Sequence, residues 1–302
     1  MKVLREVAAQ GSFSAAAESL SFTQSAVSQQ IAALERECGA SLVERGPRGI
    51  RLTDAGHALV AHADAIIARL DDAEAELAAI AGLRGGRLRL AAFQSAGATL
   101  VPRAMAEFHR RHPEVELSVK HAEQDDAQQL LRAGDVDVAV VMDFDDQPIL
   151  GRDFELTHLL RDPYCLILSA DHPLAKRRTV KLSDLADDPW IVPQTGSGCR
   201  EGAIRACRFA GFEPRLAIES DDNEQVQAFV AGGLGVGLWP RLALTNLQPG
   251  VAVKPLADGG LERAVYAATL ADGYCSPATA KMIESLREAA AEFTPPAALS
   301  AA

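Results

Sequence analysis

The chain has 302 residues, of which 48% are apolar, and its formal net charge is −11. This length fits two or three domains and this apolar fraction supplies a globular core, whereas no stretch approaches the roughly 18 apolar residues that a membrane span needs. Five irregularly spaced cysteines without a C-x-x-C pair argue against a disulfide scaffold and a zinc site, so we expect a soluble, cytoplasmic protein with reduced thiols, no metal, no cofactor and no membrane contact.

The acidic excess lies outside the first 57 residues. Residues 1–57 carry six Lys or Arg and six Asp or Glu, so this segment is neutral as a whole. Three of its arginines, Arg45, Arg48 and Arg51, lie close together near its end. Such a local cluster can contact a polyanion whatever the net charge of the chain.

Three short helices are expected between Met1 and Glu35. Their apolar residues recur at helical spacing and should face inward. These residues are Val3, Leu4 and Val7 in the first helix, Phe13, Ala16, Ala17 and Leu20 in the second, and Val27, Ile31 and Leu34 in the third. Ser12 or Ser14 is placed to cap the second helix and Thr23 the third. Two short helices joined by a tight polar turn form a helix-turn-helix.

The third helix carries a candidate DNA-reading face opposite its apolar stripe. Small and hydrogen-bonding side chains occupy this face and its flank, as entry into a major groove requires. From this face we select as DNA-binding candidates Gln24, Ser25, Ser28, Gln29 and Arg36, with Ala32 between them.

A two-stranded wing is expected directly after this helix. Apolar pairs flank the turn-forming segment Gly46-Pro47-Arg48-Gly49, a pattern typical of a hairpin. Arg48 at its tip, with Arg45 and Arg51 on its arms, would face phosphate or the minor groove. The alternative is an ordinary solvated hairpin, but its position after a helix-turn-helix favours the DNA role.

These motifs together resemble the LysR-type transcriptional regulators. The similarity rests on G-S-F-S-A-A-A-E-S-L, T-Q-S-A-V-S-Q-Q-I-A-A-L-E, G-A-S-L-V-E-R and L-T-D-A-G, in this order and without a gap. Gln29 stands where many members carry a basic residue, and Val43 where Phe is usual. The resemblance implies a sequence-specific regulator of transcription whose partners are double-stranded DNA, a small-molecule effector, RNA polymerase and a second copy of itself.

A long helix is expected from Thr53 to about Gly82. Its apolar residues alternate at spacings of four and three, which is a heptad seam for a partner helix. The seam comprises Leu59, Ala63, Ile66, Leu70, Ala73, Leu77 and Ile80. We select Leu59, Ile66, Leu70 and Leu77 as dimerisation residues, and expect a homodimer or homotetramer (a dimer of dimers) with two-fold character. The alternative is packing of this helix against its own C-terminal domain.

An α/β domain is expected from residue 86 to 293, after a hinge at residues 83–86. Its expected strands are 87–93, 115–120, 136–142, 163–169, 190–192, 215–219, 235–239 and 263–270. Its expected helices are 98–111, 123–133, 199–210, 222–231 and 276–292. This alternation favours mainly parallel sheets, and crossovers at 159–175 and 240–265 would divide them into two lobes.

The overall fold class is therefore an all-α winged helix-turn-helix domain plus a two-lobed α/β domain, and the resemblance implies a fold like that of periplasmic binding proteins. The domain boundaries are 1–57 for the head, 58–85 for the linker helix and hinge, 86–293 for the effector-binding domain, and 294–302 for a disordered tail.

Turns after three strands are the candidate effector site, because ligands of open α/β sheets bind at the C-terminal ends of strands. Hydroxyls and backbone N–H groups there suit an anionic or carbonyl-bearing metabolite, whereas Asp221 and Asp222 suit a cation. The candidates are Gln94, Ser95, Ala96, Thr195, Gly196, Ser197, Asp221 and, as an apolar wall, Phe144. Plain helix capping is the alternative for the hydroxyls, and a core role for Phe144.

Other chemistry finds less support. Ser197 lies outside a G-x-S-x-G elbow and no triad is recognisable, so no catalytic residue and no enzyme is expected. His109 and His112 have a metal-compatible spacing, but the residues around them predict a solvated helix end. Cys199 and Cys207 are eight residues apart on one helix, roughly 12 Å, which is too far for a disulfide without unfolding. A thiol-based redox sensor and an effector-independent DNA-binding protein remain the alternatives.

Overall fold

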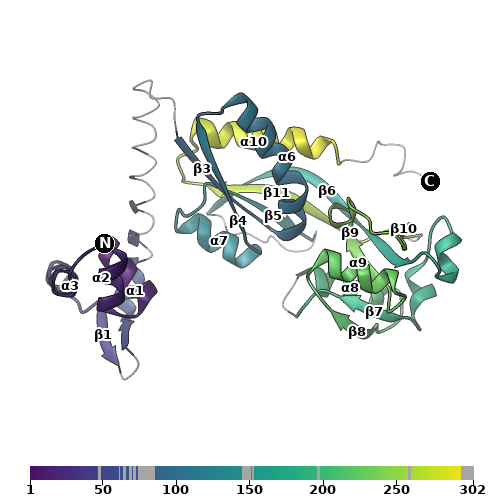
Figure 1. Cartoon of the computed structure of the whole chain (residues 1–302), viewed down its shortest axis with the longest axis horizontal. Coiled ribbons are helices and arrows are strands. Elements are labelled where there is room, and N and C mark those ends of the chain that lie inside the picture. The colour runs from purple at the N-terminus through teal and green to yellow at the C-terminus, as the bar shows by residue number, and fades with distance from the viewer. Residues whose placement is uncertain are drawn as a thin grey trace.

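The computed structural model describes residues 1–46, 49–60, 62–63, 66–67, 70, 73, 86–144, 151, 153–195, 198–257 and 260–293. Figure 1 shows a small helical head that contains the N-terminus and a larger α/β part with two lobes. The expected tail at residues 294–302 lies outside the described residues, as do residues 83–85 of the expected hinge.

The head contains the three expected helices, α1 (Lys2–Gln10), α2 (Phe13–Ser19) and α3 (Gln24–Cys38). The apolar residues that sequence spacing selected form one cluster, in which Leu4, Val7 and Val27 are completely buried. Leu20 and Leu34 are partly buried at its edge. The helix-turn-helix prediction is therefore confirmed.

A hairpin follows the helices, as expected. Strands β1 (Val43–Gly46) and β2 (Gly49–Leu52) pair antiparallel, with Val43 opposite Leu52 and Gly46 opposite Gly49. Residues 54–60 are helical, and so are the described residues of the linker that follows, up to Ala73. The rest of the expected linker helix lies outside the described residues.

The first lobe is built on three parallel strands in the order β4 (Val115–His121), β3 (Gly86–Ala92) and β5 (Val138–Asp143). Its helices are α5 (Gln94–Ala98), α6 (Leu100–Arg111), α7 (Gln124–Arg132) and α10 (Pro277–Ala291). Helices α6 and α10 pack against each other over the sheet, and their buried apolar faces close the main core of the lobe (Figure 1).

Two antiparallel strands join the lobes. The 16-residue β6 (Phe154–Ser169) pairs with β11 (Glu262–Leu270) in the first lobe. The C-terminal part of β6 then pairs with β9 (Gly237–Pro240) and β10 (Val251–Pro255) in the second lobe. One uninterrupted strand thus belongs to both lobes (Figure 1).

The second lobe adds the parallel pair β7 (Pro189–Val192) and β8 (Arg215–Glu219), covered by α8 (Gly198–Phe209) and α9 (Asn223–Ala231). Three short 3₁₀ helices complete it: η1 (Pro173–Lys176), η2 (Leu182–Leu185) and η3 (Arg241–Leu244). Trp190 is fully buried at the centre of its core, and its indole N–H donates to the carbonyl of Leu185.

The sheets correct the expectation of mainly parallel strands. The three parallel pairs within the lobes are outnumbered by the antiparallel pairs that β6 and β11 form. The expected strand 163–169 was too short because Arg161, Asp162 and Pro163 resemble a break, and β10 was missed. A strand that returns without a crossover helix leaves no helical segment in the sequence to mark it.

Candidate functional site

Helix α3, which carries the candidate DNA-reading face, presents most of its selected side chains to solvent. A left-handed Ser21, with φ of 55°, makes the turn from α2, and the Thr23 hydroxyl then caps α3 by accepting from the Ala26 N–H at 3.2 Å. Along the open face Gln24, Ser25, Gln29, Ala32 and Arg36 are exposed, while Ser28 is half-buried on the flank. Hydrogen-bonding groups are therefore available along one side of the helix.

The wing is fastened to this helix by one carboxylate. Glu35 accepts hydrogen bonds from the backbone N–H groups of Leu42 (2.8 Å) and Val43 (3.3 Å), where the chain enters β1. On β2 the Ile50 N–H donates to the Gly11 carbonyl at 2.9 Å. Both strands of the hairpin are thus tied to the helical core, which fixes the direction in which the wing projects.

Of the three selected wing arginines, the structure places one side chain. Arg51 is exposed on β2. Arg45 belongs to β1, but its side chain lies outside the described residues, as does the whole of Arg48 at the tip.

The linker helix leaves part of its heptad seam uncovered. Leu59 packs against the head core, whereas Ile66 and Leu70 are exposed, Leu70 with 59% of its surface. Ala63 is buried, Ala73 is exposed, and Leu77 and Ile80 lie outside the described residues. If the linker helix packed this seam against its own C-terminal domain, Ile66 and Leu70 would be buried. Their exposure therefore does not fit that alternative.

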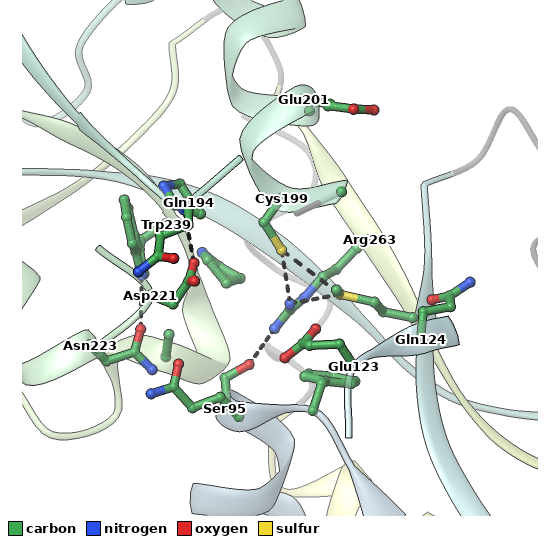
Figure 2. A pocket seen from close by; sticks show the side chains of 18 of the residues that line it. Ser95, Glu123, Gln124, Gln194, Cys199, Glu201, Asp221, Asn223, Trp239 and Arg263 are labelled. Atoms are coloured by element: carbon green, nitrogen blue, oxygen red, sulfur yellow. Dashed lines mark hydrogen bonds between the residues drawn. The ribbon is translucent and has the colours of Figure 1, made fainter. Parts of the chain in front are cut away.

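A cleft of about 1380 Å³ opens between the two lobes. It lies where strands of both lobes end, with Phe93 to Ser95 after β3, Met142 to Phe144 at the end of β5, and Ser220 to Asn223 after β8. The selected residues Gln94, Ser95, Phe144, Thr195 and Asp221 line it. Figure 2 shows Ser95 from the first lobe facing Gln194, Asp221 and Asn223 from the second.

Three selected residues are placed differently. Ala96 is fully buried in the core of the first lobe and does not line the cleft, because α5 turns its small side chain away from the opening. Its selection as an effector contact is wrong for this structure. Gly196 and Ser197 lie outside the described residues.

A buried arginine at the base of the cleft was missed from the sequence. Arg263 on β11 is only 2% exposed and forms an ion pair with Asp162 of β6 at 2.8 Å. It also donates to the Ser95 hydroxyl at 2.6 Å (Figure 2). It donates to the Met142 sulfur at 3.0 Å, and its guanidinium carbon lies 4.7 Å from the centroid of the Phe93 ring. Ser95 is therefore not a helix cap but a partner of Arg263.

This arginine connects the two lobes. The Arg263 Nη1 atom, which donates to Met142, also lies 3.7 Å from the Cys199 sulfur on α8. Its partner Asp162 accepts from the Leu242 N–H of η3 at 3.0 Å. Burial opposes the positive charge, yet the adjacent Asp162 carboxylate raises the pKa of Arg263 above its ordinary value. The guanidinium therefore stays charged between elements of both lobes.

Sequence signals for this cluster were weak. Asp162 lies between Arg161 and Pro163, with apolar residues on both sides of the three, so it resembles part of a polar break rather than half of a buried pair. Arg263 resembles a surface residue beside Glu262. Only the antiparallel register of β6 and β11, with Arg263 opposite Asp162, brings the two together.

The apolar wall of the cleft is formed as expected around Phe144. Its ring lies 5.9 Å from that of Tyr164, and Gly202 leaves it room, because a Cβ there would lie 3.3 Å from the ring. On the second lobe the Trp239 indole donates to Asn223 at 2.9 Å and Asp221 accepts from the Gln194 N–H at 2.9 Å (Figure 2). Asp221 thus orders the loop after β7 as well as lining the cleft.

The cysteines do not form a redox pair. Cys207 is fully buried on α8, and burial raises the pKa of its thiol to about 12, so it holds little of the nucleophilic thiolate. Within the described part of the chain no group of three His, Cys, Asp or Glu side chains could hold a metal ion, and no helix is long and apolar enough to cross a membrane.

Two family models match the chain. Residues 1–57 match the bacterial regulatory helix-turn-helix protein, lysR family, and residues 81–291 match the LysR substrate binding domain. Among curated relatives, the probable HTH-type transcriptional regulator LrrA of Synechococcus elongatus is 33% identical over 97% of both chains. The HTH-type transcriptional activator CmpR of Synechocystis is 31% identical over 88% of this chain and 86% of its own.

Solved structures agree with the fold. A full-length OxyR variant from Pseudomonas aeruginosa has a TM-score of 0.72 at 26% identity, covering 96% of this chain and 92% of that one. Full-length CbnR in complex with its target DNA has a TM-score of 0.68 at 25% identity, covering 95% and 98%. The cysteine geometry described above does not favour redox sensing. With both domains matched along their length, the chain belongs to the LysR family of DNA-binding transcriptional regulators, with a helix-turn-helix head and an effector-binding domain.

Proposed function

We propose that this regulator is controlled by a small molecule that binds between its two lobes. The observation that carries the proposal is the cleft itself, because its walls come from both lobes and Arg263 contacts elements of each. A ligand that favours one relative position of the lobes shifts the population of conformations, and with it the spacing of paired heads.

The exposed face of α3 reads the operator. Gln24, Ser25, Ser28, Gln29 and Arg36 contact base edges and the neighbouring backbone, and Arg45, Arg48 and Arg51 of the wing contact phosphate. The exposure of the α3 face and its capped, rigid start support this assignment.

Gln29→Ala tests the reading face, with Gln30→Ala as the matched control on the opposite flank of α3. The expected result is a loss of discrimination between operator and random DNA by about 1–3 kcal/mol for Gln29→Ala only. Arg51→Ala should weaken binding to both DNAs evenly and reduce the salt dependence. Gel shifts at two salt concentrations measure the affinity of all three variants for both DNAs. If all three variants bind the operator as tightly as the wild type, the assignment is rejected.

Two chains associate through Leu59, Ile66, Leu70 and Leu77 as a homodimer or a dimer of dimers. The exposed Ile66 and Leu70 support this seam. Leu70→Asp should reduce the mass measured by light scattering, whereas His62→Asp, which adds the same charge to an exposed site on the same helix, should not. An unchanged mass for Leu70→Asp would reject the seam.

The ligand contacts Gln94, Ser95, Phe144, Thr195, Asp221 and the neighbouring Gly196 and Ser197. A thermal-shift screen of metabolites on the full chain tests for such a ligand, since binding to the folded state raises the melting temperature. A true effector must also change the footprint on operator DNA. If no stabilising compound does so, the chain regulates independently of an effector.

We assign the protein to the cytoplasm, where RNA polymerase is a further partner.

A further inference from the structure

Two amide side chains on α9 line the cleft with their oxygens already engaged. The indole N–H of Trp239 donates to Oδ1 of Asn223 at 2.9 Å (Figure 2). The hydroxyl of Ser220 donates to Oε1 of Gln225 at 3.0 Å. Each bond occupies the oxygen end of the amide, so the NH₂ group is what both side chains have left to offer a ligand.

These orientations follow from the chemistry of the two donors. An indole nitrogen can only donate a hydrogen bond, so Asn223 has to turn its oxygen toward Trp239. The Ser220 hydroxyl already accepts from the Asp222 N–H at 3.2 Å, which leaves its hydrogen to donate to Gln225. An amide that is fixed at its oxygen in this way acts as a hydrogen-bond donor.

The direction of the indole N–H is itself fixed by packing. Trp239 is only 4% exposed, and its strand β9 pairs with β6. Its ring packs in a core cluster with Ile191 and Val226. Because the ring cannot turn without disturbing this cluster, it holds the Asn223 amide in one orientation.

A third donor lies on the other lobe. The Ser95 side chain lines the cleft, is 5% exposed, and accepts from the Arg263 guanidinium at 2.6 Å. A guanidinium has no acceptor atom, so this bond leaves the hydroxyl hydrogen of Ser95 unused. None of the described residues accepts that hydrogen.

The two lobes therefore present donors to one another. Figure 2 shows Asn223 and Ser95 facing each other, each bonded at its oxygen to its own partner, Trp239 or Arg263. Within the described part of the chain, neither the Asn223 nor the Gln225 NH₂ group has an acceptor. A ligand atom with lone pairs between the lobes would satisfy all of these donors.

The simplest alternative is that Asn223 only serves the buried indole of Trp239, since a buried N–H needs an acceptor. That reason accounts for one amide. It does not account for Gln225, which is oriented by a different donor, or for Ser95, whose bond partner comes from the first lobe. The shared property of the three is a hydrogen directed at the same cleft.

We propose that Trp239 and Ser220 are positioning residues, which orient Asn223 and Gln225 as donors to a carbonyl-type oxygen of the effector, while Ser95 donates to the effector from the first lobe. The inference rests on the proposed ligand-controlled function and specifies the chemistry of the ligand. A ligand whose polar groups are all ammonium or guanidinium would place donors against donors and is rejected. An oxygen-bearing ligand bonded from both sides holds the lobes together.

Two probes with the same four-carbon backbone test for an acceptor oxygen. Dimethyl succinate is neutral and carries only acceptors, whereas 1,4-diaminobutane is protonated and can only donate. With the full chain, dimethyl succinate should raise the melting temperature more than 1,4-diaminobutane does. If the diamine stabilises the chain as much or more, or if neither probe does, the assignment is overturned.

Asn223→Asp separates the donor role from the structural one. The carboxylate still accepts from Trp239 and lies in the first turn of α9, so the variant should fold as stably as the wild type. It has no NH₂ group, so dimethyl succinate should bind about fivefold more weakly, the value of one hydrogen bond.

The matched control is Asn246→Asp, which makes the same change at an exposed site that does not line the cleft. It should bind dimethyl succinate as the wild type does. Equal affinity in the two variants, measured by calorimetry, would overturn the proposal.

The indole signals in an NMR spectrum test the positioning role of Trp239. The chain has two tryptophans, and the N–H of the other, Trp190, donates to Leu185 in the core. Dimethyl succinate should shift the Trp239 signal, because its bond to Asn223 is polarised when the amide donates to a ligand, and leave the Trp190 signal in place. A Trp239 signal that does not respond at saturation would remove its positioning role.

Trp239→Phe assigns these signals and frees the amide to turn. It should weaken dimethyl succinate binding about as much as Asn223→Asp does, while an unchanged Trp190 signal shows that the core of the second lobe is intact. Wild-type affinity in Trp239→Phe would show that the indole does not orient the donor.

Failure of ligand control has a different readout, the DNA footprint in the metabolite screen. A footprint that responds only to compounds without acceptor oxygens keeps ligand control and overturns the donor assignment. Probe binding that depends on Asn223, with a footprint that no compound changes, keeps the donor assignment and overturns ligand control.

Discussion

The candidate residues on α3 are close together in the sequence, whereas the residues at the base of the cleft come from distant segments. The candidates on α3 lie within 13 consecutive residues, and one helical period brings them to the same face. In the cluster at the base of the cleft, Arg263 donates directly to Ser95, which is 168 positions away, and also contacts Asp162 and Cys199. In the head the candidate DNA contacts therefore lie apart from the core, whereas in the cleft the candidate contact Ser95 is buried with Arg263.

The largest effect is expected at the buried ion pair. Arg263→Met should lower the free energy of unfolding by about 3–5 kcal/mol, because it leaves the Asp162 carboxylate buried without its cation. Urea denaturation measures it. Adding Asp162→Asn should recover much of the loss, since the amide oxygen can still accept from Leu242. A double variant no more stable than Arg263→Met would show that the charge is not the cause.

A smaller loss of about 3 kcal/mol is expected from Gly56→Ala in the head. A Cβ at Gly56 would lie 2.0 Å from the Leu42 carbonyl oxygen, which is backbone and cannot move aside easily. Gly39→Ala is the control, because its left-handed φ of 68° costs only about 1 kcal/mol and nothing lies within 4 Å. If thermal denaturation shows Gly39→Ala to be the more destabilising of the two, close packing at Gly56 does not determine the stability of the head.

The Glu35 carboxylate should matter less for stability and more for DNA. Glu35→Ala removes the acceptor for the Leu42 and Val43 N–H groups, at a cost of about 2 kcal/mol. DNA affinity should also fall, because the wing loses its fixed direction. Glu37→Ala, at an exposed site on the same helix, should change stability by less than about 0.5 kcal/mol. Equal gel-shift affinity for both variants would show that the wing needs no such tether.

The smallest effect on stability is expected on the reading face itself. Ser25→Ala and Gln29→Ala should each change the free energy of unfolding by less than about 0.5 kcal/mol, since both side chains are exposed. A loss of more than about 1 kcal/mol, measured by urea denaturation, would show that these exposed side chains also contribute to folding of the head.

Local patterns were enough to predict the head and most elements of the α/β domain. Thr23 was recognised as a cap and Arg215–Glu219 as a strand, because each signal lies within a few residues. The cleft was predicted in outline, since Ser95, Thr195 and Asp221 follow strands whose C-terminal ends meet.

The remaining features depend on pairing between distant segments. Nothing near Arg263 indicates that it is buried, and its neighbour Glu262 favours a surface position. The length of β6 was underestimated because Asp162 and Pro163 interrupt its apolar pattern, although the register with β11 uses both residues. Burial of a charge becomes predictable only when its partner across the sheet is known.

Because β6 is one continuous strand in both lobes, a rotation at its middle moves both lobes. From Pro163 the strand runs into each lobe for several residues, and at about 3.3 Å per residue its two ends lie roughly 50 Å apart along the chain. A rotation of only about 5° at the middle would therefore displace each end by about 2 Å, given these roughly 25 Å arms. Asp162 and Arg263 lie near the middle of β6. A ligand that rotates the strand slightly at this point would therefore displace both lobes by a larger distance.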